Sequence, residues 1–130
     1  MPDEGRFNQA VLGTLLVRID DDGRARVRMF PKPTHRNVQD AVHGGVTLAF
    51  IDVAMFGGGG LLTDQRVARG LTVEVSTQFL GPGDAERPLD ALVEVVKETG
   101  RMVFLRGTIE QDDDMVAAFS GILRKASSGK

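Results

Sequence analysis

Residues in the middle of the chain have the types and the spacing to do chemistry. Asp52 is the one ionisable residue between Gly44 and Leu62, a stretch otherwise made of apolar residues, glycines and one threonine. His43 and the pair Gly44-Gly45 come just before this stretch. Because burying an unpaired carboxylate is costly, Asp52 must find a partner or face a cavity. In a cavity it could act as a nucleophile or a general base.

The glycine pair precedes a predicted helix over 46–55. Unpaired N–H groups at a helix start carry the positive end of the helix dipole, and they can hold an anion or a developing oxyanion. A glycine there also lets a substrate approach the backbone closely. Two structural alternatives stay open: the glycines could serve a tight turn, and His43 could be an ordinary hydrogen-bonded loop histidine.

Asp52 has a structural alternative too. It could cap a backbone group or pair with Arg36 or Arg69, since an isolated acid can also belong to a purely structural ion pair. We weigh this alternative and the catalytic one evenly on the residues alone.

No metal and no cofactor are predicted. His35, Asp40 and His43 match no standard ligand spacing, and the acidic turns at 20–23 and 112–114 do not fit a calcium loop. Ser120 lacks the glycine frame of a nucleophile elbow.

The composition narrows the possible class of protein further. A chain of 130 residues fits one domain, its formal net charge of -2 gives no basic field for nucleic acid, and it has no cysteine. Acids stand in the first twenty residues where a signal peptide needs bases. The apolar stretch 42–62 is nearly long enough for a bilayer, but an aspartate and six glycines interrupt it. We therefore expect a cytoplasmic protein that binds neither nucleic acid nor membrane.

The hydrophobic pattern predicts six strands and one central helix. Alternating apolar and polar residues favour strands at 13–20, 24–30, 71–80, 89–98, 101–111 and 115–125. Residues 46–55 are apolar on every side, which is typical of a helix buried all round. The glycines at 57–60 indicate helix fraying or tight packing. An α+β fold follows, in which an antiparallel sheet of about six strands wraps one helix. Residues 1–125 form a single domain, and 126–130 have the composition of a disordered tail.

The order of these residues carries a family resemblance. Asn37, His43, Gly44, Gly45 and Asp52 form the pattern N-x5-HGG-x6-D, and GLTVEVSTQFLGP follows from residue 70. This arrangement resembles the hotdog-fold acyl-CoA thioesterases, in particular the phenylacetyl-CoA thioesterase-like (PaaI-like) group. The likeness extends in pattern from about residue 13 to residue 125.

The resemblance implies a hotdog fold, a homodimer or homotetramer with sites between subunits, and hydrolysis of acyl-CoA thioesters to a free acid and CoA. Asp52 would be the nucleophile or general base, and the Gly44 N–H would polarise the thioester carbonyl. Asn37 would position the carbonyl or the attacking water. His43 would stand beside the oxyanion donor.

The resemblance also places Gly45 and Thr72 at the substrate, and it shows one departure. Asp40 stands where relatives commonly have glycine, and a second carboxylate there could repel an anionic substrate or alter the loop.

Two other functions fit the same residues. A hotdog dehydratase or hydratase would depend on His43 and an acid from another element, and a catalytically silent module would only bind acyl-CoA.

Helix geometry agrees with a site between subunits. Eight residues separate Gly44 from Asp52, and at 1.5 Å each they lie roughly 12 Å apart along a helix. One helix therefore does not bring both to one carbonyl. Two antiparallel helices across a two-fold axis place the acid of one subunit near the helix start of the other.

Overall fold

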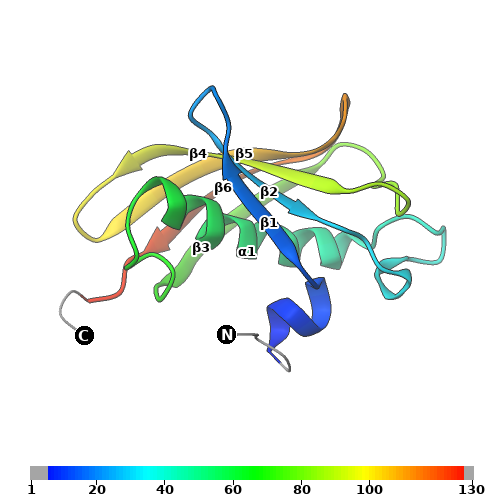
Figure 1. Ribbon diagram of the computed structural model, residues 1–130, viewed down its shortest axis with the longest axis horizontal. Coiled ribbons are helices and arrows are strands. Elements are labelled where there is room, and N and C mark those ends of the chain that lie inside the picture. Colours follow the sequence, from blue (N-terminus) through cyan, green and yellow to red (C-terminus); the bar gives the residue numbers. More distant parts are fainter. Residues whose placement is uncertain (1–5, 128–130) are drawn as a thin grey trace.

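The computed structural model describes residues 6–127 (Figure 1). These residues form six strands: β1 (Leu15–Ile19), β2 (Ala25–Met29), β3 (Leu71–Phe79), β4 (Leu89–Glu98), β5 (Met102–Gln111) and β6 (Asp114–Arg124). The long helix is α1 (Gly44–Leu62), and two short helical turns precede it, η1 (Asn8–Leu12) and η2 (Pro33–His35). This is the predicted hotdog fold.

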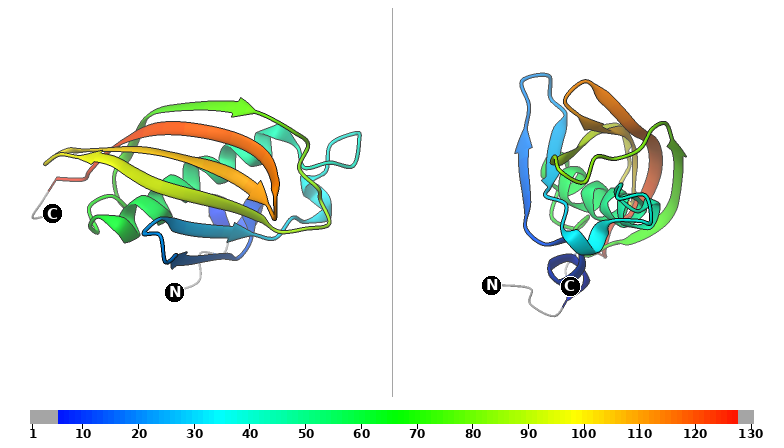
Figure 2. Two further views of the ribbon diagram at one scale, coloured as in Figure 1. Left: turned by 90° about the horizontal axis from the view of Figure 1, so that it is seen from above. Right: turned by 90° about the vertical axis from the view of Figure 1, so that its right-hand side faces the viewer.

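The strands form one antiparallel sheet in the order β1-β2-β4-β5-β6-β3. Figure 2 shows that this sheet curves around α1, so the helix lies inside the bend. The two acidic clusters expected to be turns are turns, at 20–23 and at 112–113. Strands β1 and β3 are the two edges of the sheet within the described residues.

Strand β3 contains a β-bulge that changes the direction of one side chain. Thr72 pairs with Leu123 and Glu74 pairs with Ile122, so Val73 has no partner of its own. Directly paired residues share a face of the sheet, and Leu123 is fully buried on the face toward α1. The bulge therefore turns Thr72 toward the helix. Uninterrupted alternation would have placed it on the other face, with Glu74.

Helix α1 is longer than predicted, because the glycines at 57–60 continue it to Leu62. The fraying interpretation was wrong, and tight packing is confirmed. A Cβ on Gly58 would lie 3.0 Å from the Val93 Cβ and 3.2 Å from the Ala25 Cβ. Since those atoms belong to neighbouring strands, glycine is what lets α1 lie directly on β2 and β4.

Only one face of α1 is buried in the single chain. The buried positions recur every three or four residues, and they are Thr47, Phe50, Ile51, Ala54, Met55, Gly58 and Gly59. On the other side of the helix Ala49, Val53 and Phe56 are only half-buried. Burial on every side was therefore the wrong expectation for one chain.

By length and composition α1 also passes as a membrane-spanning helix, with 19 residues and a mean hydropathy of 1.6. A helix packed in a protein core has a similar composition, because its buried face needs mostly glycine, alanine and large apolar residues to pack against a sheet. The apolar composition of α1 is therefore accounted for by its packing on the sheet.

The N-terminal turn η1 was not predicted, since residues 6–12 have no clear periodicity. Leu12 at its end is fully buried, which anchors the turn under the sheet. At the other end of the chain the Ala126 N–H donates to the Arg66 carbonyl oxygen at 2.9 Å. The rest of the predicted tail, 128–130, lies outside the described residues.

The packing of α1 gives a stability test with a matched control. We expect Gly58→Val to lower the free energy of unfolding by about 2 kcal/mol, because the side chain overpacks against Val93 and Ala25. Gly57→Val should change it by less than about 0.5 kcal/mol, since no atom lies within 4 Å of a Cβ there. Urea unfolding of both variants measures the difference. Equal stability of the two would contradict this packing.

Candidate active site

Asp52 lies on the uncovered side of α1 and is half-buried. The Thr72 hydroxyl donates to its Oδ1 at 2.6 Å. Both residues are predicted site residues, and the bulge in β3 brings them together. A neutral donor holds the carboxylate in place while leaving its charge uncompensated, unlike an arginine or lysine. Such an arrangement would allow Asp52 to act as a base or a nucleophile.

A pocket of about 410 Å³ opens beside Asp52. Its remaining walls come from three parts of the chain, and they are Asn8, Val53, Phe56, Gly57, Ala68 and Gly70. Most of these residues are apolar or lack a side chain. Asp52 thus faces a pocket and not the solid core.

The wall at Ala68 and Gly70 is held by charged residues next to it. Lys125 Nζ lies 2.5 Å from a Glu98 oxygen and 3.3 Å from an Asp64 oxygen. Hydrogen bonds from Arg66 lower the pKa of Asp64 to about 2, with a smaller contribution from Lys125. Gly70 itself has no room for a side chain, since a Cβ would lie 2.0 Å from the Arg124 carbonyl oxygen. These contacts keep the segment after α1 closed onto β6.

The start of α1 forms the second part of the site. His43 is the N-cap, and its Nδ1 accepts the Gly45 N–H at 2.9 Å. The His43 carbonyl oxygen accepts the N–H groups of Val46 and Thr47. Among the described residues, the Gly44 N–H has no acceptor. Capping therefore leaves one backbone donor of this helix start open to a ligand.

The two glycines are not there for turn chemistry. Neither belongs to the glycines with positive φ in the described chain, which are Gly13 and Gly23. A Cβ on Gly45 would lie 3.1 Å from His43 Nδ1, so Gly45 makes room for the capping ring, and its N–H is already used. A Cβ on Gly44 would meet only the Phe79 ring, at 3.7 Å. Glycine at 44 thus leaves space at the open donor.

Asn37 organises the loop before the helix. Its Oδ1 accepts the N–H groups of Gln39 at 2.8 Å and Ala41 at 3.1 Å, which leaves the Nδ2 group as a donor. Asp40 has a positive φ of 62°. Glycine adopts this conformation without cost and aspartate tolerates it better than most residues, which accounts for Asp40 at the position where the resemblance has glycine.

His35 has a structural role. Its Nδ1 accepts the Lys32 N–H at 3.0 Å and its Nε2 lies 2.5 Å from the Val11 carbonyl oxygen, so the proton is on Nε2. Its carbonyl oxygen accepts the His43 N–H at 2.8 Å. Both ring nitrogens are occupied, so His35 is unsuited to bind a metal. Through these bonds it fixes the position of His43.

The predicted site residues therefore form two groups. Asn37, His43, Gly44 and Gly45 lie at the start of α1, and Asp52 with Thr72 lies roughly 12 Å further along the helix. The predicted alternative of an Asp52–Arg36 pair was wrong, since Arg36 pairs with Glu86.

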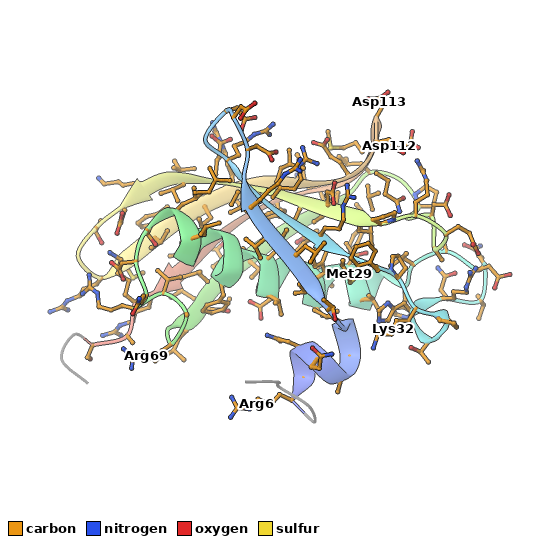
Figure 3. All side chains as sticks on the ribbon, viewed as in Figure 1. Arg6, Met29, Lys32, Arg69, Asp112 and Asp113 are labelled. Atoms are coloured by element: carbon orange, nitrogen blue, oxygen red, sulfur yellow. The ribbon has the colours of Figure 1, made fainter. Side chains whose placement is uncertain are left out.

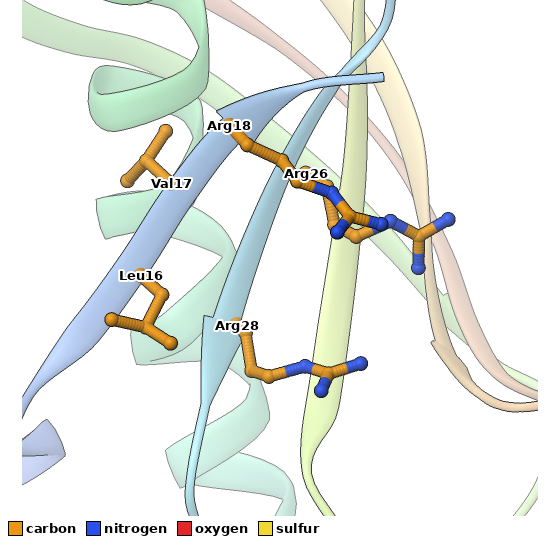
Figure 4. Close-up of a pocket in the computed structure, with 5 residues that line it drawn as sticks. All are labelled: Leu16, Val17, Arg18, Arg26 and Arg28. Carbon is orange, nitrogen blue, oxygen red and sulfur yellow. The ribbon is translucent and has the colours of Figure 1, made fainter. Parts of the chain in front are cut away.

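A second pocket, of about 250 Å³, is lined by arginines on the β1–β2 hairpin (Figure 4). Arg26 and Arg28 donate to both oxygens of the buried Asp90 at 2.7–2.8 Å. Burial would raise the pKa of Asp90, but these hydrogen bonds outweigh it and lower the pKa. Arg18 and Arg26 share Asp20 in the same way. This pocket is an ion-pair network with its charges satisfied, in contrast to Asp52.

The sequence interpretation missed Asn8, Ala68 and Gly70. Asn8 lies 44 positions before Asp52 in a segment without a recognisable motif, so no sequence signal pointed to it. Gly70 had one: it directly precedes a predicted strand, where a glycine often marks a close backbone approach.

Comparison with known proteins identifies the family of the chain. The sequence profile described as acyl-CoA thioesterase N-terminal domain matches residues 32–123, which hold all of the predicted site residues. The chain therefore belongs to the acyl-CoA thioesterase family, whose members are thioester hydrolases. No curated protein sequence matches the chain.

Several solved structures share the fold at low sequence identity. The E. coli PaaI protein of the phenylacetic acid degradation operon is 23% identical, with a TM-score of 0.75 over 95% of this chain and 87% of that one. A Bacillus halodurans protein solved with CoA is 22% identical, with a TM-score of 0.75 over 98% and 83%. Zebra fish thioesterase superfamily member 2 is 17% identical, with a TM-score of 0.78 over 95% and 89%.

The capping role of His43 is testable apart from any chemistry. We expect His43→Ala to lower the free energy of unfolding by about 1 kcal/mol, because the Gly45 N–H loses its acceptor. His43→Asn should restore most of that loss, since asparagine is a favourable N-cap residue. Urea unfolding compares the two variants with the wild type. If asparagine is no better than alanine, capping is not what His43 contributes.

Proposed function

We propose that this protein hydrolyses acyl-CoA thioesters to a free acid and CoA at Asp52. The observation that carries the proposal is the Asp52 carboxylate, held by the Thr72 hydroxyl at 2.6 Å beside a mostly apolar pocket. The family profile supports the substrate class.

In the proposed reaction the thioester carbonyl accepts a hydrogen bond from the Gly44 N–H. Asp52 then either takes a proton from a water that attacks the carbonyl carbon, or attacks that carbon itself. Negative charge develops on the carbonyl oxygen, where the open N–H and the helix dipole stabilise it. The C–S bond breaks as the carbonyl re-forms, and the CoA thiolate leaves and takes up a proton. If Asp52 attacks, water then cleaves the mixed anhydride to give the same acid.

We further infer that the two groups of site residues meet across a homodimer. Only 39% of an 18-residue apolar stretch of α1 is buried in one chain. The free edge strand β3 exposes Leu71, Val73 and Phe79 by more than half. An antiparallel second copy would cover both surfaces, and it would place the Gly44 N–H of one subunit near Asp52 of the other.

The observations weigh against the hydratase alternative. A catalytic histidine needs a ring nitrogen free to move a proton and an acid from another element to orient it. Among the described residues no acid hydrogen bonds to the His43 ring, and its Nδ1 instead accepts the Gly45 N–H of its own helix. The binding-module alternative predicts tight acyl-CoA binding without release of thiol, so an assay for free CoA distinguishes it.

Asp52→Asn should lower kcat by at least about a hundredfold, the usual scale for a positioned acid or base. The amide oxygen can still accept the Thr72 hydroxyl, so the fold should persist. Thiol release from a panel of acyl-CoA esters measures the effect. Asp113→Asn is the control, because it removes one carboxylate at the tip of the β5–β6 turn, far from α1 (Figure 3). Turnover at the wild-type rate by Asp52→Asn would remove Asp52 from the mechanism.

The shared site is tested by mixing two inactive chains, Asp52→Ala and Gly44→Pro. Proline at 44 removes the open N–H, and it is compatible with the first helical position. His43 before it has a ψ of 135°, which a following proline allows. In the mixed dimer one site has intact Gly44 and intact Asp52, so we expect about half of the wild-type activity per dimer if the two sites act independently.

Two differently tagged chains allow the mixed dimer to be purified before the assay. Folding of the Gly44→Pro chain is checked by circular dichroism. Purified mixed dimers without activity would show that the two groups do not meet across the subunits.

A further inference from the structure

The N-terminal turn η1 brings one more polar side chain to the Asp52 pocket. Asn8 lines this pocket, and besides Asp52 it is the one polar residue among the lining residues. The other lining residues are apolar or glycine. Asn8 is uncharged, exposed in the open pocket, and carries both a donor and an acceptor.

Contacts along η1 hold Asn8 in this position. The Val11 carbonyl oxygen accepts from His35 Nε2, and Lys32 Nζ donates to the Ala10 carbonyl oxygen at 3.2 Å. Figure 3 shows Lys32 on the loop beside the turn. With Leu12 fully buried, the turn is tied to the body of the protein at consecutive residues.

The pocket extends from Asp52 along α1 to Phe56 and Gly57. Four to five residues of helix span roughly 6–7.5 Å, the length of a short acyl chain. With the thioester carbonyl at Asp52, the acyl group would lie along this wall, within the pocket that Asn8 also lines. An acyl carboxylate is disfavoured there because Asp52 repels it.

We propose, on the basis of the function proposed above, that Asn8 determines acyl specificity by hydrogen bonding an uncharged oxygen on the acyl chain, a hydroxyl or a keto group. Acyl groups with such an oxygen are then preferred over unsubstituted ones of the same length. The preference arises because a bound apolar acyl chain displaces water from the Asn8 amide and offers it no partner in return.

The test compares kcat/KM for hexanoyl-CoA with kcat/KM for its 3- and 6-hydroxy derivatives. We expect the wild type to prefer at least one hydroxylated ester. Asn8→Ala should lower that preference ratio by about tenfold, the scale of one neutral hydrogen bond. Gln9→Ala, on the same exposed turn but outside the pocket lining, should leave the ratio as in the wild type.

The outcomes separate the two proposals. If the wild type releases no thiol from any of these esters, the proposed function fails. If it hydrolyses them and Asn8→Ala keeps the wild-type ratio, only the role of Asn8 is overturned, and the same holds if kcat/KM falls equally for all esters. Should Asn8→Ala not fold, Asn8→Leu keeps a side chain of similar size and removes both the donor and the acceptor. Its ratio must then also change, and an unchanged ratio again overturns the proposal.

Discussion

The structure depends on how a helix that is apolar on every side is covered. The sheet covers one face of α1, where Gly58 allows contact with Ala25 and Val93. The other side carries Asp52 and the half-buried Val53 and Phe56, and in the single chain it borders an open pocket. A carboxylate is tolerable on that face because it is half-buried and hydrogen bonded. The proposed dimer is the simplest way to cover the rest while keeping the acid accessible.

The start of α1 illustrates how a cap selects a binding group. A helix start has several unpaired N–H groups, and here His43 accepts that of Gly45 with its ring and those of Val46 and Thr47 with its carbonyl oxygen. What is left is the single donor of Gly44. A histidine at this position thus shapes the helix start through structure, because its capping bonds leave one N–H open.

Charge pairing separates the structural acids of this protein from the candidate catalytic one. Asp90 is more deeply buried than Asp52, yet two arginines occupy both of its oxygens. Asp64 is similarly held by Arg66 and Lys125. Asp52 receives a neutral hydroxyl instead. The isolation of Asp52 in the sequence accounts for this difference, since the apolar residues around it place no cation beside it on the helix.

The sequence by itself determined the elements and the chemical candidates. Alternation and apolar runs are local patterns, so the six strands, the central helix and the candidates His43, Gly44 and Asp52 could be found without coordinates. Asn37 was added by the family resemblance of the motif. Only the tertiary structure decided the position of Thr72, since strand alternation alone put it on the wrong face until the bulge at Val73 turned it. The same holds for Asn8, which reaches the pocket through contacts between distant segments. Local patterns carry no information about such contacts, because pairing register and long-range packing are decided when the whole chain folds.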